Sequence, residues 1–132
     1  METIIAQIGK TAYTTTIRSV KHELVSDEPT QWGGKDEGFS PNELLASSLG
    51  ACTSITLKMY ADRKQLELEE IIVKVTFERN SAKNTSEFKR EITLKGNLTD
   101  DQKQRLLQIA NLCPIHKALT NPIHIESYLT QD

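Results

Sequence analysis

The sequence predicts an α+β domain, because three kinds of segment follow one another along its 132 residues. Short stretches rich in β-branched residues fill the first third, and a long apolar helix pattern follows them. Two longer alternating stretches then precede a second helix pattern. The expected element order is βββ-α-ββ-α-β, and this length fits one domain spanning residues 1–132.

The N-terminal third alternates in the way that is typical of strands. The three expected strands span residues 3–8, 12–17 and 20–25. Gly9 and Lys10 separate the first two strands and predict a hairpin turn. A Gly-rich, acidic loop follows and carries Trp32, with Phe39 at its end. Because both side chains are large and apolar, we expect them to rest against other parts of the protein.

A long helix is predicted from Pro41 to about residue 64. Ser40 is a favourable N-cap, proline fits the first helical position, and Glu43 completes a capping box. Apolar or small residues recur at helical spacing along the segment, namely Leu45, Leu49, Cys52, Ile55, Thr56 and Met59. This broad apolar face predicts a central helix that is buried on most sides.

The second half predicts a hairpin, a helix that breaks at a proline, and a last strand. Residues 69–78 and 87–95 alternate as an antiparallel pair with one wet face. Thr99 and Gln102 form a second capping box, and the helix that they open breaks at Pro114. Pro114 can itself begin a short helix to about residue 119. Residues 123–129 are expected to form the final strand.

Charge and composition exclude several classes of partner. The 16 Lys and Arg residues against 18 Asp and Glu residues give a net charge of −2, so we expect no nucleic-acid partner. The N-terminus lacks a signal-peptide pattern, and no apolar stretch reaches the roughly 20 residues of a membrane span. We therefore expect a cytoplasmic protein without a membrane partner. A standing disulfide is disfavoured in that compartment.

Cys52 and Cys113 are the two cysteines, and their spacing does not suggest a zinc site. Cys113 directly precedes Pro114, so it is expected at the N-cap of the short helix. The helix start, His116 and Lys117 could supply positive charge that favours a thiolate. A small hydrophobic residue at a helix break is an equally good interpretation of Cys113.

Cys52 lies in the middle of the long helix, on its apolar face, where burial raises a thiol pKa. Its local sequence predicts a core residue unless a cation and a proton acceptor reach it from elsewhere. Glu43 begins the helix nine residues earlier, about 13 Å away along the axis. The capping box accounts for Glu43 without a further role.

The residues of these motifs together resemble a known family. The segment from Ser40 to Leu45, the segment from Leu49 to Cys52 and the segment from Cys113 to Leu119 are similar to the OsmC/Ohr superfamily of osmotically inducible and organic-hydroperoxide-resistance proteins. The segment from Asp27 to Gly34 resembles its OsmC-like branch. The resemblance covers nearly the whole chain.

This resemblance implies an intertwined homodimer, with antiparallel sheets around two long central helices and active sites at the subunit interface. It implies reduction of organic hydroperoxides without a bound cofactor. Cys52 would attack the peroxide and become a sulfenic acid, and Cys113 would resolve it as an intramolecular disulfide. An external thiol, of the dithiol or lipoyl type, would reduce that disulfide.

The resemblance also implies an arginine from the N-terminal region and a helix glutamate beside Cys52. Arg18 and Lys10 are the candidates for the cation. Alignment on Pro41 and Cys52 places the glutamate position on Asn42, with Glu43 one residue later. The apolar substrate pocket is expected to include Trp32, Phe39, Leu49 and Met59.

Two alternatives stay open from the sequence. One is a non-enzymatic OsmC-like dimer that binds a small apolar or thiol-reactive ligand, with cysteines that sense oxidation or only pack. The other is a structural dimer whose thiols are inert.

Overall fold

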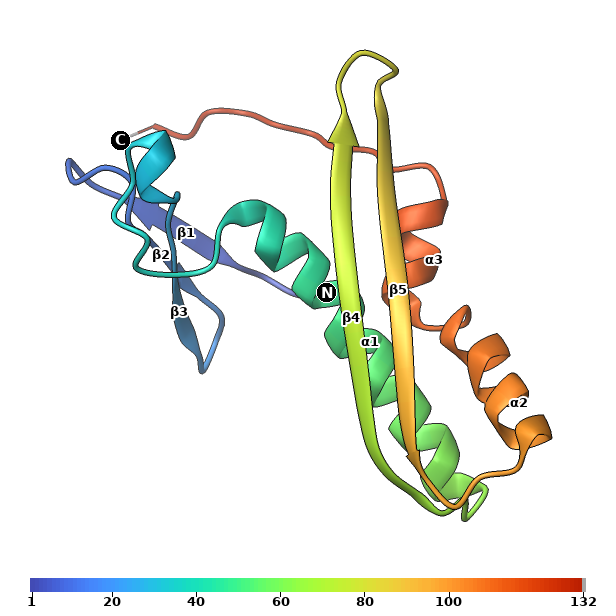
Figure 1. The fold of residues 1–132 in the computed structure, drawn as a ribbon. Coiled ribbons are helices and arrows are strands. Elements are labelled where there is room, and N and C mark those ends of the chain that lie inside the picture. Colours follow the sequence, from blue (N-terminus) through green and yellow to red (C-terminus); the bar gives the residue numbers. More distant parts are fainter. Residues whose placement is uncertain (132) are drawn as a thin grey trace. The chain divides into compact units, whose positions relative to one another are not determined.

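The element order agrees with the prediction as far as the short helix after Pro114 (Figure 1). The computed structural model describes residues 1–131. The elements are β1 (Ile5–Ile8), β2 (Thr15–Arg18), β3 (Glu23–Ser26), the 3-10 helix η1 (Thr30–Trp32), α1 (Pro41–Arg63), β4 (Leu68–Asn80), β5 (Thr85–Gly96), α2 (Asp100–Ala110) and α3 (Pro114–Thr120). The chain divides into two compact units, of which the first holds residues 1–47 and 77–88. The second unit holds residues 48–76 and the chain from residue 89 onward. The prediction of a single domain stays a prediction.

In the first unit, β1, β2 and β3 form an antiparallel sheet in which Ile17 lies opposite Ala6 and Leu24. The loop after β3 is organised by the buried carboxylate of Asp27, which accepts hydrogen bonds from four backbone N–H groups and one hydroxyl. The donors are Tyr13 N, Thr14 Oγ1, Glu28 N, Lys35 N and Glu37 N.

The loop aromatics do not behave as expected. Trp32 and Phe39 are 68% and 57% exposed. The expectation that they rest against other parts of the protein is therefore wrong for this structure. The loop is ordered instead by hydrogen bonds to Asp27 and by Ser26 Oγ, which donates to the carbonyl of Phe39 at 2.7 Å.

The core of the second unit lies where α1 and α2 meet the inward side chains of β4 and β5. Leu57, Leu106, Ile109 and Ala110 form a buried cluster. Ile71 of β4 and Ile92 and Leu94 of β5 pack against it. Exposure alternates along both strands, so the predicted hairpin with one wet face is confirmed.

Helix α1 buries a narrower stripe than its sequence predicts. Its buried residues are Leu49, Thr53, Leu57 and Ala61, which recur every fourth position. Ile55 and Met59, expected on the buried face, are 54% and 60% exposed. The expectation that the helix is buried on most sides is therefore wrong for the single chain. The helix carries two apolar stripes, and the described residues cover one of them.

The predicted strand at residues 123–129 is wrong, because residues 121–131 carry no strand. Ile123, Ile125 and Leu129 are 65%, 81% and 99% exposed. A strand needs a neighbouring backbone to pair with, and the residues that the structure describes supply none to this segment.

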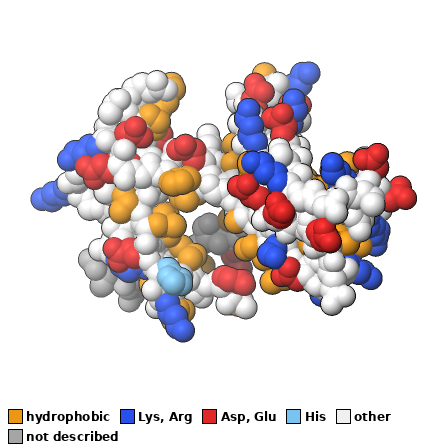
Figure 2. Space-filling model, turned by 60° about the horizontal axis from the view of Figure 1, so that its bottom comes forward, with side chains coloured by type: hydrophobic (Ala, Val, Ile, Leu, Met, Phe, Trp, Pro, Cys, Tyr) orange, Lys and Arg blue, Asp and Glu red, His pale blue; other side chains and the backbone are white. Residues whose placement is uncertain are grey.

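Apolar side chains also reach other parts of the surface. Figure 2 shows hydrophobic groups interspersed with lysine, arginine and acidic side chains. Tyr13, Leu24 and Ile72 are among the large hydrophobic residues that are more than two-fifths exposed. No helix within residues 1–131 has both the length and the apolar character needed to cross a bilayer.

Candidate active site

The second unit brings the two predicted thiols together. Cys52 lies on α1 and is partly exposed, whereas Cys113 precedes α3 and is fully buried. Both are free thiols. The Cys52 side chain lies close enough to Cys113 to lower the pKa of its thiol, and Oγ1 of the neighbouring Thr53 lies 3.8 Å from Cys113 Sγ. A partly exposed cysteine is thus paired with a buried one, which is the arrangement that a dithiol reaction needs.

Local sequence explains the position of Cys113. Helix α2 ends at Ala110, and Pro114 begins α3 because its fixed φ suits the first helical position. Cys113 is the N-cap residue between them, and its sulfur accepts the backbone N–H of His116 at 3.3 Å. The predicted N-cap position is confirmed.

Arg90 is a member of this site that the sequence analysis missed. One nitrogen of its guanidinium, Nη1, donates to Thr53 Oγ1 at 3.0 Å and to the carbonyl of Ala110 at 2.9 Å. The other, Nη2, donates to Asn111 Oδ1 at 2.9 Å and lies 2.8 Å from Nδ1 of His116. Arg90 therefore ties β5 to α1, to the end of α2 and to α3.

A signal for Arg90 was present in the alternation of β5. Arg90 shares the inward register with Phe88, Ile92 and Leu94, and all four are partly buried. A charged residue on the apolar side of a half-buried strand requires polar partners, because an unpaired charge there is costly. Those partners lie 20 or more residues away in sequence, so the strand pattern alone could not name them.

The surroundings of Cys113 favour its thiolate. Burial raises the pKa of this thiol. Hydrogen bonds from the backbone N–H of His116 and from the side chains of Cys52 and Thr53, together with the charge of Arg90, outweigh burial. The pKa of Cys113 consequently lies below its ordinary value, as the local sequence suggested.

His116 does not supply the positive charge that its sequence position suggested. Burial lowers the pKa of its imidazole, and the neighbouring Arg90 lowers it further. Because Arg90 donates to Nδ1, the neutral ring carries its hydrogen on Nε2. The cation of the site is Arg90, and His116 is one of its acceptors.

The other predicted catalytic residues lie in the first unit. Glu43 Oε1 accepts the backbone N–H of Ser40 at 2.9 Å, and Ser40 Oγ accepts the N–H of Glu43 at 3.1 Å. This capping box is confirmed. Arg18 Nη2 donates to Gln7 Oε1 at 2.7 Å. The catalytic roles of Glu43 and Arg18 stay predictions, as does the alternative role of Lys10.

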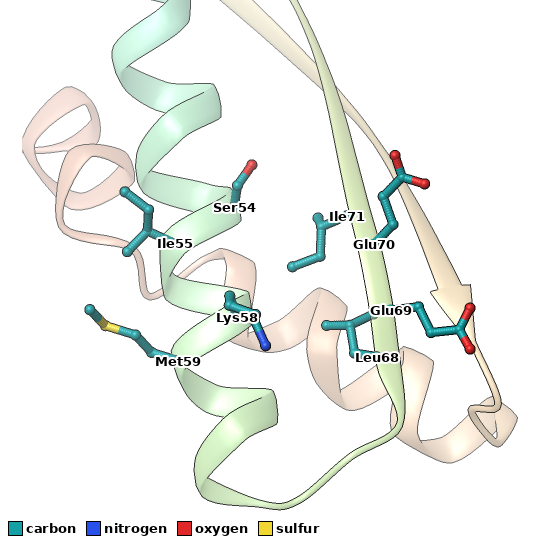
Figure 3. A pocket seen from close by; sticks show the side chains of 8 residues that line it. All are labelled: Ser54, Ile55, Lys58, Met59, Leu68, Glu69, Glu70 and Ile71. Carbon is teal, nitrogen blue, oxygen red and sulfur yellow. The ribbon is translucent and has the colours of Figure 1, made fainter.

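The four residues predicted for the substrate pocket have different surroundings. Met59 lines an apolar pocket of about 430 Å³ between α1 and β4. Its other lining residues are Ser54, Ile55, Lys58, Leu68, Glu69, Glu70 and Ile71. Leu68 and Ile71 point toward α1, whereas the carboxylates of Glu69 and Glu70 point away (Figure 3).

The other three predicted residues are not among those that line this pocket. Leu49 is buried in the same stripe of α1 as Thr53. Trp32 lines a smaller pocket, of about 150 Å³, in the first unit. Phe39 belongs to the first unit as well. Residues 1–131 contain no group of three or more His, Cys, Asp or Glu side chains placed to hold a metal ion.

Comparison with known families matches residues 34–127 to the family described as OsmC-like protein. The match includes both cysteines, Arg90 and His116. The chain belongs to the OsmC-like family. This result confirms the resemblance that the cysteine motifs suggested, and comparison with curated proteins gave no match.

Solved structures of related fold support the same assignment for this OsmC-like protein. A protein of Psychrobacter arcticus described as an osmotic stress induced and detoxification response protein is 25% identical, with a TM-score of 0.78 over 94% of this chain and 89% of that one. The organic hydroperoxide resistance protein OhrB of Bacillus subtilis is 20% identical, with a TM-score of 0.62 over 91% of this chain and 90% of that one.

A third structure is an organic hydroperoxide resistance protein OsmC of Legionella pneumophila, also described as a predicted redox protein. It is 20% identical, with a TM-score of 0.60 over 91% of this chain and 89% of that one. The OsmC-like protein described here thus has the mixed α+β fold of the OsmC/Ohr proteins, with antiparallel sheets.

Proposed function

We propose that this OsmC-like protein is a thiol-dependent peroxidase that reduces organic, apolar hydroperoxides. The observation that carries the proposal is the pairing of a partly exposed Cys52 with a buried Cys113 inside one compact unit. Similarity to structures described as organic hydroperoxide resistance proteins supports the substrate class.

Cys52 is the attacking residue in this proposal, because it is the cysteine that is partly exposed. Its thiolate attacks the distal oxygen of the hydroperoxide, an S–O bond forms and the O–O bond breaks. The alkoxide leaves and takes a proton from solvent, and the sulfur becomes a sulfenic acid. Cys113 then attacks that sulfur, which forms a Cys52–Cys113 disulfide and releases water.

An external thiol of the dithiol or lipoyl type completes the proposed cycle. Its thiolate attacks the disulfide and forms a mixed disulfide, and its second thiol then releases the reduced protein. The two free cysteines suit a reducing compartment, so we place the protein in the cytoplasm.

We further propose that the working form is a homodimer. The exposed stripe of α1 that includes Ile55 and Met59 is an apolar surface that a second copy could cover. In this proposal Arg18 and Glu43 are the cation and the carboxylate that act on Cys52.

Thiol titration with one equivalent of cumene hydroperoxide tests the peroxidase activity. The wild type should lose two thiols for each chain and form an intramolecular disulfide. Cys113→Ser should stop at a sulfenic acid that dimedone traps, whereas Cys52→Ser should keep its remaining thiol. Both thiols persisting in folded wild-type protein would contradict the proposal. Arg18→Met and Glu43→Gln in the same assay test whether these two residues contribute to the reaction of Cys52.

The second candidate is a non-enzymatic protein that binds a small apolar or thiol-reactive ligand. The apolar pocket between α1 and β4 favours it, since this pocket is lined by Ile55, Met59, Leu68 and Ile71. Binding of a fluorescent apolar probe that is lost in Ile71→Asp, together with unreactive thiols, would support this candidate over the peroxidase.

A further inference from the structure

We propose that Arg90 is a positioning residue that, together with Thr53, holds Cys113 ready as the resolving thiolate and so sets the rate of disulfide formation. The step that it serves rests on the proposed peroxidase function. The placement of Arg90 itself does not, because it follows from contacts within the second unit.

The charge of Arg90 is fixed in place and is not neutralised by its hydrogen-bond partners. Four groups hold the guanidinium, and they are a hydroxyl, a backbone carbonyl, a side-chain amide and a neutral imidazole. A carboxylate partner would cancel most of its field, but these four neutral groups leave the positive charge free to act on a nearby anion. Cys113 is the group whose ionisation this charge favours.

Thr53 connects the cation to the sulfur. Its hydroxyl lies 2.7 Å from the carbonyl of Leu49, to which it donates, and 3.8 Å from Cys113 Sγ. Because Arg90 donates to the same oxygen, the single hydroxyl hydrogen remains available for either Leu49 or the sulfur.

Because the Thr53 hydroxyl can donate to either acceptor, the buried sulfur has a hydrogen-bond partner both as a thiol and as a thiolate. When Cys113 is a thiol, its S–H can donate to Thr53 Oγ1 while the hydroxyl donates to Leu49. When Cys113 is a thiolate, the hydroxyl can turn and donate to the sulfur. A buried anion without such donors would be costly, so Thr53 lowers the cost of ionising Cys113.

The groups that face Cys113 from the other packed elements complete the site. The backbone N–H of His116 donates from α3, the neutral ring of His116 accepts from Arg90, and Cys52 approaches from α1. The sulfur is 0% exposed. A thiolate held there cannot readily reach a peroxide in solvent, but it is placed to attack a sulfenic acid on its neighbour.

In this step the Cys113 thiolate attacks the sulfur of the Cys52 sulfenic acid. An S–S bond forms, the S–O bond breaks, and hydroxide leaves with the electron pair and takes up a proton to become water. The sulfur of Cys113 is oxidised and that of Cys52 is reduced. The thiolate fraction of Cys113 therefore governs the rate.

The first experiment needs no peroxide. In a Cys52→Ser background, thiolate ultraviolet absorbance against pH reports Cys113 alone. Arg90→Met should raise the titration midpoint by about one pH unit or more, since a neighbouring opposite charge is worth about 1–3 units. Arg90→Lys keeps the charge and should shift the midpoint less. If the Cys113 midpoint in both variants equals the midpoint of the Cys52→Ser protein that keeps Arg90, the inference is overturned.

Thr53→Val and Thr53→Ser form a matched pair for the hydroxyl, so the test survives if Arg90→Met fails to fold. After one equivalent of cumene hydroperoxide, trapped sulfenic acid and disulfide are quantified over time. In Thr53→Val the disulfide should form about tenfold more slowly at neutral pH, corresponding to a shift of one unit, and the deficit should narrow as pH rises. Thr53→Ser should stay near the wild-type rate.

The outcomes separate the two proposals. If the wild-type thiols do not react with peroxide, the proposed function fails, and the titration midpoints still decide the role of Arg90. If the sulfenic acid forms but decays at the wild-type rate in Thr53→Val and Arg90→Met, with unchanged midpoints, the inference fails while the peroxidase stands. A deficit that does not change with pH would indicate a structural effect and would also overturn the inference.

Discussion

Nδ1 of His116 lies 2.8 Å from Nη2 of Arg90, so a histidine accepts a hydrogen bond from a permanent cation. Burial and this charge both lower the pKa of the imidazole from its ordinary value of 6.5. We predict that the His116 ring titrates below that value when it is followed by NMR. Arg90→Met should move the midpoint upward, and a midpoint at or above 6.5 in the wild type would contradict the placement.

The same pair links stability to pH. Between the lowered pKa of His116 and the ordinary value, the unfolded chain binds a proton that the folded chain does not. The free energy of unfolding should therefore fall as pH drops below about 6.5. His116→Gln should lose this part of the pH dependence in urea unfolding. His124 is exposed, so His124→Gln should keep the same pH dependence as the wild type.

Asp27 predicts a second pH effect, in the first unit. Burial raises the pKa of its carboxyl, but backbone hydrogen bonds from Glu28, Glu37, Lys35 and Tyr13 outweigh burial and lower it below 3.8. A carboxyl whose pKa is lowered by folding stabilises the fold at pH values above its pKa in the unfolded chain. This stabilisation is lost as the pH falls through its pKa in the folded chain.

Asp27→Asn should therefore destabilise the loop after β3 at neutral pH and flatten the acid branch of the unfolding curve. Amide protection of Lys35 and Glu37, measured by hydrogen exchange, reports the loop directly. Glu2→Gln changes an exposed residue of the same unit and serves as the control. Unchanged protection in Asp27→Asn would show that the carboxylate does not organise the loop.

Leu57 lies at the centre of the second unit and is 0% exposed. Leu57→Ala should lower the free energy of unfolding by about 2–5 kcal/mol, through lost transfer energy and the cavity that remains. The neighbouring Lys58 forms an exposed i,i+4 ion pair with Asp62 at 2.6 Å. Lys58→Ala should cost less than about 1 kcal/mol. Equal losses in urea unfolding would contradict the observed orientation of α1.

Gly96 ends β5 with a φ of +142°, and a Cβ there would collide with the carbonyl of Glu67. Gly96→Ala should destabilise the turn between β5 and α2 by more than about 1 kcal/mol, because both the conformation and the contact are strained. A Cβ on Gly9 would meet nothing within 4 Å. Gly9→Ala should therefore be tolerated, and thermal unfolding of the two variants compares them.

The exposed stripe of α1 gives a prediction about assembly. If a second copy covers Ile55 and Met59, Ile55→Asp should shift the protein toward monomer in sedimentation velocity, because a buried charge opposes the contact. Asp62→Asn, an exposed change on the same helix, should leave the assembly unchanged. A wild type that sediments as a monomer at micromolar concentration would contradict the proposed dimer.

Features that depend on residues close in sequence could be predicted well. Both capping boxes join residues three positions apart, Ser40 with Glu43 and Thr99 with Gln102, and both are present. The N-cap at Cys113 follows from the proline after it. In each case the side chain and the backbone group that it satisfies lie within one helical turn.

Features that depend on distant partners could not be predicted in this way. Arg90 reaches Thr53 across 37 positions, and the strand pattern contains no information about α1. The helix pattern of α1 likewise shows one broad apolar face, and which part of that face meets β4, β5 and α2 depends on tertiary packing. The segment at residues 123–129 has a strand pattern, but pattern alone does not supply a neighbouring strand.

The sulfur of Cys113 is also the acceptor that completes the first turn of α3, through the backbone N–H of His116. Any chemistry at this sulfur, whether oxidation, alkylation or protonation, therefore changes how well a helix begins. Hydrogen exchange at the single amide of His116 would then serve as a built-in indicator of the state of the thiol. The stability of the first turn of α3 would then report the oxidation state of Cys113.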